Sequence, residues 1–223
     1  MLDHDFHLTT PRLFISHLLP TNDAHCDFIH DLMLSPGITK EMPAAAVEKA
    51  MSTPPRDAGR KFIADCVDRM ENTGYGRYLI SLKPTSTSDI SALEESTLPF
   101  SERRLVPIGV VSMQHARFPS APAAPTIPDV GFGLLSRYFG NGYATEAATA
   151  LLNYFREEKG QKEFCAFCRP DNEASKNALI RLGFEPRGLR EVHGVVEGEL
   201  LSVLVWTMGI GHEEGVLEAR GLW

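Results

Sequence analysis

The spacing of apolar residues predicts a strand followed by three helices in the first third of the chain. Apolar side chains fill most of the segment 12–19, which is typical of a strand. From 24 to 33 they recur at the three- and four-residue spacing of one helical face. The same spacing predicts helices over 44–51 and 57–72.

Cap and turn residues indicate where these elements begin and end. Thr21 and Asn22 precede the first helix, and both side chains are common N-caps. Pro36 and Gly37 are expected to stop that helix. Gly74 follows the third helix, as a glycine in the left-handed conformation commonly does.

The rest of the chain alternates strands with two helices. Strands are expected over 77–83, 106–116, 129–135, 163–168, 184–192 and 200–208, and helices over 143–159 and 171–182. The last two strands look like an antiparallel pair. This order predicts a single α+β domain over 1–223, whose mainly antiparallel sheet acquires βαβ character in its second half.

Two segments are predicted to be flexible surface insertions. Residues 84–104 are rich in Ser, Thr and Glu. Residues 117–128 contain four prolines, which cannot supply the N–H donors of a strand ladder. The tail 209–223 shows no periodic pattern and receives no assignment.

Composition narrows the classes of function. The net charge of -7 disfavours general binding to nucleic acid or to an anionic membrane. No apolar run approaches the ~20 residues of a membrane helix. The N-terminus lacks the basic and apolar regions of a secretory signal, so we expect a cytoplasmic protein.

Four cysteines raise the question of a metal or redox site. Cys165 and Cys168 form a C-x-x-C pair. They fall on a predicted strand, where side chains three apart point to opposite faces, and no second pair has zinc spacing. We therefore expect no metal site.

The strongest chemical signal is the glycine-bearing segment RYFGNGYATEA, residues 137–147, between a predicted strand and helix. Glycines let the backbone turn tightly and approach a ligand closely. The first N–H groups of a helix have no internal acceptor, and the helix dipole adds partial positive charge. This segment therefore predicts an anion site.

Two common phosphate-binding motifs do not fit the segment. No Lys-Ser/Thr pair follows the glycines, as a P-loop requires. Thr145 stands where the third glycine of G-x-G-x-x-G would be. What remains resembles the R/Q-x-x-G-x-G/A element of the GNAT N-acetyltransferases, and GNGYATEA resembles their RimJ/RimL branch.

Three other motifs extend the resemblance in the expected order. DVGFGLL, residues 129–135, resembles that branch's strand before the loop. RPDNEASKNALIRLGF, residues 169–184, resembles its N-x-x-S…LGF helix. TPRLFISHL, residues 10–18, resembles its T-x-R-L first strand.

The resemblance implies a GNAT fold, with a mixed, mostly antiparallel sheet flanked by helices and splayed between the strands at 130–135 and 163–168. Acetyl-CoA would lie at this splay. N–H groups of residues 138–144 would hold its pyrophosphate, and the strand edges and the 169–184 motif its pantetheine arm. The implied cofactor contacts are Leu134, Leu135, Arg137, Tyr138, Phe139, Gly140, Asn141, Gly142, Tyr143, Ala144, Asn172 and Ser175.

Catalytic roles are implied for two residues. Asp129 aligns with the acidic residue that often acts as base, directly or through water. Ser175 would protonate or hydrogen-bond the departing sulfur, and an N–H near Leu134 would stabilise the oxyanion.

Structural alternatives stay open for each of these residues. Asp129 is otherwise a solvated residue, Ser175 a helix-surface hydroxyl, and Asn172 an N-cap. Glu146 is expected to be a first-turn carboxylate favoured by the helix dipole, and His193 a surface residue.

The sequence thus supports an acetyl-CoA-dependent N-acetyltransferase acting on a primary amine, either a protein N-terminus or a small-molecule amine. A non-catalytic CoA-binding sensor or scaffold and a general interaction domain are the alternatives. The identity of the acceptor is open, and a homodimer is compatible with the sequence.

Overall fold

A computed structural model describes residues 2–40, 44–84, 97–115, 124–196 and 198–223. Its eight strands are hydrogen-bonded in the order β1-β2-β3-β4-β5-β6-β8-β7. The chain divides into two compact units, one of residues 1–111 with 132–150 and one of residues 112–131 with 151–223. The predicted α+β fold with a mixed, mostly antiparallel sheet is confirmed.

The first unit is built on antiparallel strands near the N-terminus. Strand β2 (Leu13–His17) pairs with β1 (His7–Thr9) on one side and β3 (Gly76–Leu82) on the other. Strands β4 (Val106–Gln114) and β5 (Asp129–Leu134) follow, and their residues 112–114 and 129–131 belong to the second unit. The sequence pattern did not predict β1, because three residues are too few for a periodic signal.

Among the described residues of the same unit, four helices precede β3. They are α1 (Asp23–Met33), α2 (Pro36–Thr39), α3 (Ala44–Ser52) and α4 (Pro55–Thr73). Helix α1 ends where predicted, but Pro36 then starts the single turn of α2 because proline is well suited to the first helical position. Gly74 ends α4 in the left-handed conformation.

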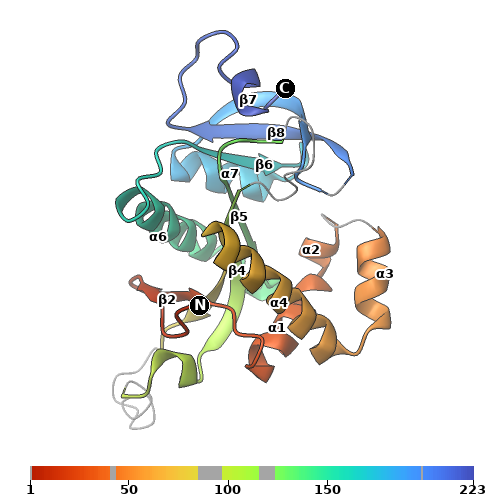
Figure 1. The fold of residues 1–223 in the computed structure, drawn as a ribbon, viewed down its shortest axis with the longest axis vertical. Coiled ribbons are helices and arrows are strands. Elements are labelled where there is room, and N and C mark those ends of the chain that lie inside the picture. Colours follow the sequence, from red (N-terminus) through yellow and green to blue (C-terminus); the bar gives the residue numbers. More distant parts are fainter. Residues whose placement is uncertain (1, 41–43, 85–96, 116–123, 197) are drawn as a thin grey trace. The chain divides into compact units, whose positions relative to one another are not determined.

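Helices α1 and α4 lie against each other in Figure 1, and Gly59 explains how closely they approach. A Cβ atom at Gly59 would lie 1.9 Å from the carbonyl oxygen of Cys26, so no side chain fits there. Around this contact the two helices close an apolar core with strands of the unit, made of Leu18, Cys26, Phe28, Ile29, Leu32, Ile63, Leu79, Val110 and Leu135.

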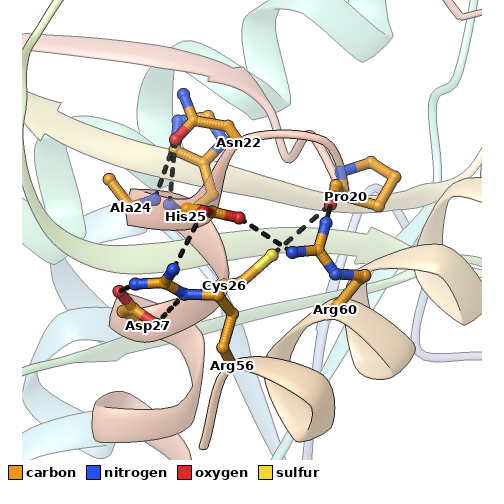
Figure 2. Close-up of polar contacts among 9 residues, drawn as sticks. Pro20, Asn22, Ala24, His25, Cys26, Asp27, Arg56 and Arg60 are labelled. Carbon is orange, nitrogen blue, oxygen red and sulfur yellow. Dashed lines mark hydrogen bonds and ion pairs between the residues drawn. The ribbon is translucent and has the colours of Figure 1, made fainter.

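Ion pairs join the exposed faces of the same two helices (Figure 2). Arg56 binds Asp27 at 2.6 Å and Asp23 at 2.9 Å, and Arg60 binds Asp23 at 2.8 Å. Arg60 also donates to the carbonyl of Pro20. The Arg56 side chain and its partners are about half exposed, so these pairs add little to stability.

The second unit holds the C-terminal strands. Strand β8 (Leu200–Met208) pairs with β6 (Phe164–Cys168) and with β7 (Glu185–His193), both antiparallel. Helix α7 (Glu173–Leu182) connects β6 to β7. Helix α6 (Tyr143–Glu157) begins in the first unit and ends in the second.

The C-terminal tail, unassigned from sequence, packs into this unit. Leu217 and Leu222 join a core with Ile127, Cys165, Val192, Val203, Val205 and Ile210. Arg220 forms a bidentate pair with Glu163. The carbonyl of Trp223 accepts the N–H of Glu191 in β7.

Only parts of the two predicted insertions can be described, since 85–96 and 116–123 lie outside the described residues. The remainder of the first contains a 3-10 helix, Phe100–Glu102, whose Phe100 is buried and stacks on His7. In the remainder of the second, Thr126 donates its N–H to Arg220.

Candidate cofactor-binding and catalytic site

The segment between β5 and α6 is a tight turn with two left-handed glycines. A 3-10 helix, Ser136–Tyr138, follows Leu135. Gly140 and Gly142 have φ of 77° and 78°, a region that costs an L-residue about 1–2 kcal/mol. We call residues 137–145 the cofactor loop.

Backbone hydrogen bonds determine which donors of the cofactor loop are used internally. The N–H of Tyr138 donates to Leu135 and that of Phe139 to Ser136, at 2.9 and 3.1 Å. The side-chain amide of Asn141 donates to the carbonyls of Tyr138 and Phe139. The N–H groups that the loop can present to a ligand therefore begin at Gly140.

The N–H groups of residues 140–145 donate to no other residue in the described part of the chain. The first helical bond runs from Glu146 to the carbonyl of Gly142. Successive donors near left-handed glycines, at the positive end of a helix dipole, suit an anion with several oxygens. The geometry fits a diphosphate.

Two residues near the N-terminus, Thr10 and Arg12, support the loop through a contact for which no local sequence pattern exists. Arg12 donates from Nε to Glu146 Oε2 at 2.7 Å and from Nη1 to the Asn141 carbonyl at 2.9 Å. Thr10 donates to Glu146 Oε1 at 2.6 Å. Glu146 lies in the first turn of α6, as expected, and it is also the centre of this network.

The network keeps the carboxylate of Glu146 charged. Burial disfavours the ionised form, but hydrogen bonds from Thr10 and Arg12 and the charge of Arg12 outweigh it. The pKa of Glu146 is therefore held below its ordinary value.

The remaining side chains of the cofactor loop face different neighbours. Arg137 is exposed, with its guanidinium 5.0 Å from the ring centre of Tyr138. Phe139 is exposed and lies near Gly37 of α2. The Tyr143 ring lies 4.6 Å from the guanidinium of Arg12.

The predicted contact residues at the end of β5, Leu134 and the following Leu135, have buried side chains, so only their backbone can bind a ligand. The N–H of Leu135 donates to the carbonyl of Ile108 in β4. Successive N–H groups of a strand point to opposite edges, so the N–H of Leu134 points away from β4.

Asp129 begins β5 within the second unit and pairs with Cys165 of β6 in parallel register. Its residue exposure is 6%, so the alternative of a solvated residue does not hold. Two other buried polar residues lie on β4, where Gln114 donates to the Ser112 hydroxyl and Ser112 to the Gly131 carbonyl.

Also in the second unit, Asn172 caps helix α7. Its side-chain oxygen accepts the N–H of Ser175 at 3.1 Å. Asn172 is therefore the N-cap of α7, as the structural alternative predicted. The predicted cofactor contact of its side-chain amide stays a prediction. Ser175 is partly exposed, and its hydroxyl makes no hydrogen bond to any described residue. His193 ends β7 opposite Leu200.

The structure also places the cysteines and the other potential metal ligands of the described ranges. The four cysteines are thiols there, with Cys165 and Cys168 both buried. No cluster of three potential metal ligands occurs among the described residues. Nor does any described helix combine the length and apolar character needed to cross a membrane.

Comparison with known proteins identifies the family. Residues 17–185 match the model of the acetyltransferase (GNAT) domain. The uncharacterized protein YkkB of Bacillus subtilis (strain 168) is 36% identical over 58 residues, which are 26% of this chain and 34% of YkkB. The chain therefore matches about a third of the length of this curated relative.

Solved structures share the fold at low identity. A Vibrio cholerae protein described as a ribosomal-protein-serine acetyltransferase has a TM-score of 0.67 at 16% identity, over 93% of this chain and 99% of that one. RimL, a ribosomal L7/L12 α-N-protein acetyltransferase in complex with coenzyme A, has a TM-score of 0.59 at 17% identity, over 90% and 95%.

The family model covers well over half of the chain, so the chain belongs to the GNAT acetyltransferase family. Its RimJ/RimL-like character agrees with the neighbours in fold. The chain accordingly contains a GNAT acetyltransferase domain, and the non-catalytic alternative is not favoured.

Proposed function

We propose that this protein acetylates a primary amine by direct attack on acetyl-CoA, with the cofactor loop as the seat of the pyrophosphate. The observation that carries the proposal is the run of N–H donors at residues 140–145, which no described residue uses. Arg137 adds positive charge next to this run. In the second unit, Asn172 is proposed to contact the pantetheine arm through its side-chain amide.

In the proposed reaction the amine nitrogen bonds to the thioester carbonyl carbon and the carbon–sulfur bond breaks. Asp129 accepts the amine proton, directly or through water. The N–H of Leu134 donates to the oxyanion as charge develops. The Ser175 hydroxyl donates a hydrogen bond or its proton to the departing sulfur.

A protein N-terminus is the first acceptor to test. Both solved structures compared above are described as acetyltransferases of ribosomal proteins, and RimL is named for an α-amine. Small-molecule amines are the second class. A cytoplasmic location and a homodimer also stay predictions.

Release of free CoA from acetyl-CoA tests the activity, using peptides with different N-terminal residues and a panel of small amines. We expect turnover with at least one acceptor and a product heavier by one acetyl group in mass spectrometry. CoA binding with no turnover on any amine would contradict the proposed acetyl transfer.

Asp129→Asn tests the proposed base while keeping the size of the side chain. We expect kcat to fall by about 10²–10⁴-fold, as loss of a general base does, with CoA affinity retained. Asp65→Asn is the control, because this exposed carboxylate on α4 pairs with Lys61 at 3.5 Å and has no place in the proposed site. A wild-type rate in Asp129→Asn would exclude Asp129 as the base.

A further inference from the structure

The cofactor loop is supported by two residues, Thr10 and Arg12, which have no role in the proposed reaction. Thr10 and Arg12 lie just before β2, and both contact Glu146 in the first turn of α6. We infer that Arg12 is a positioning residue for acetyl-CoA, which holds the loop so that its N–H groups stay available to the diphosphate. This inference rests on the proposed role of the loop.

The first contact fixes a peptide plane of the cofactor loop. Arg12 Nη1 donates to the carbonyl oxygen of Asn141 at 2.9 Å. In a trans peptide the carbonyl and the following N–H point in opposite directions. Because Arg12 holds the carbonyl of Asn141, the N–H of Gly142 is directed away from Arg12.

The glycines on both sides of Asn141 make this contact necessary. Gly140 and Gly142 can adopt many backbone conformations, so they allow the loop to turn but do not by themselves keep one arrangement. Asn141 does not cap the helix: it lies two residues before Tyr143, and its side-chain NH2 donates backward to the carbonyls of Tyr138 and Phe139. Arg12 supplies the missing restraint.

The second contact ties the same guanidinium to helix α6. Nε and Nη2 of Arg12 reach Glu146 Oε2 at 2.7 and 2.6 Å, and the backbone N–H of Arg12 reaches Oε1 at 2.9 Å. The Tyr143 ring covers the guanidinium. A planar, forked group is needed to reach a carboxylate and a carbonyl at once, so lysine cannot replace it.

Burial separates this pair from the other arginine pairs of the unit. The Glu146 side chain is 15% exposed, against 54% for Asp23 and 46% for Asp27, which bind Arg56 (Figure 2). Arg12 and Arg56 themselves are equally exposed, at 48% and 50%. Arg56 is thus a matched control for the loss of an exposed arginine and its ion pair.

Calorimetry with CoA on the full chain tests the inference, using Arg12→Ala, Arg12→Lys, Glu146→Gln and the control Arg56→Ala. We expect Arg12→Ala to weaken CoA binding by about tenfold or more, the size of a lost charged hydrogen bond. Arg12→Lys should also weaken it, although the charge is kept. Arg56→Ala should stay within about twofold of wild type.

Glu146→Gln separates positioning from simple charge attraction. The substitution removes a negative charge close to an anion site, so attraction alone predicts tighter CoA binding. Positioning predicts weaker binding, because the carboxylate that orients Arg12 is lost. Once an amine acceptor is identified, the same variants should show a higher KM for acetyl-CoA and a nearly unchanged kcat.

Wild-type CoA affinity in Arg12→Lys together with equal or tighter binding in Glu146→Gln would overturn the inference, even if Arg12→Ala fails to fold. Failure of the wild-type protein itself to bind CoA would instead refute the proposed cofactor loop. The two failures are therefore distinguishable.

Discussion

Helices α1 and α6 begin in opposite ways. At α1 the side chain of Asn22 accepts the N–H groups of Ala24 and His25, at 3.0 and 3.3 Å. At α6 no described side chain accepts from residues 140–145. The residue just before that helix is Gly142, and Asn141 before it points its amide back into the preceding turn.

The difference shows how a helix start is kept available for a ligand. A local cap satisfies the first donors of α1 and thereby removes them from use. Helix α6 is held instead by Arg12 on the carboxylate of Glu146, one turn inside the helix. Anchoring one turn inside the helix stabilises its start and leaves the N–H groups of residues 140–145 without an acceptor among the described residues.

The largest expected effect is on the cofactor loop itself. Gly142→Asp should weaken CoA binding by more than about 100-fold, because it adds a carboxylate beside the proposed pyrophosphate seat and forces an aspartate into φ of 78°. A Cβ there would also lie 3.6 Å from Nη2 of Arg12. Calorimetry with CoA measures the loss.

Gly74→Asp is the matched control, because Gly74 has φ of 75° and a Cβ there would meet nothing within 4 Å. It should reproduce the cost in stability without the loss in CoA affinity. Near-normal binding by Gly142→Asp would refute the placement of the pyrophosphate.

A smaller effect should appear at the start of α1 as pH falls. His25 accepts the N–H of Leu19, and burial lowers its pKa to about 4 from 6.5. Between those values the unfolded chain binds a proton that the folded chain does not. Stability should therefore fall as the pH drops from 6.5 to 4, by at most about 3 kcal/mol.

His25→Asn keeps an acceptor and removes the titration, so its urea-unfolding free energy should depend less on pH over this range. The pair of Arg12 and Glu146 at α6 should behave differently. Because the pKa of Glu146 is lowered, its contribution to stability should persist until the pH falls below the ordinary range of a glutamate pKa. An unchanged pH slope in His25→Asn would refute this account.

The smallest effects compare two capping asparagines. Asn22→Ala and Asn172→Ala should each cost about 1 kcal/mol of unfolding free energy, measured in urea. Only Asn172→Ala should also weaken CoA binding, if its amide serves the pantetheine arm. Equal CoA affinity in both variants would leave Asn172 with a capping role alone.

The sequence predicted most elements of this fold to within a few residues, because their apolar spacing and glycine ends are local signals. Helix α4 and Gly74 are one example, and the pair β7 and β8 another. The tail escaped prediction because Ile210, Leu217 and Leu222 reach the core from irregular spacings.

In the candidate site, too, features with a local sequence signal could be predicted and tertiary contacts could not. The cofactor loop was predictable, since glycines before a helix act through their own backbone. Its internal use of the Tyr138 and Phe139 donors was not, because this depends on the conformation of the turn. The partnership of Arg12 and Glu146 is a tertiary contact between two segments that each looked complete alone.

That partnership joins residues 134 positions apart. A contact of such high sequence separation forms only when the intervening chain has closed, so helix α6 can be helical before its loop is competent to bind. Coenzyme A binding during refolding should therefore report when the N-terminal segment has docked, and not when helix α6 has formed. A fragment confined to residues 129–184 would carry three of the four family motifs and would lack Arg12.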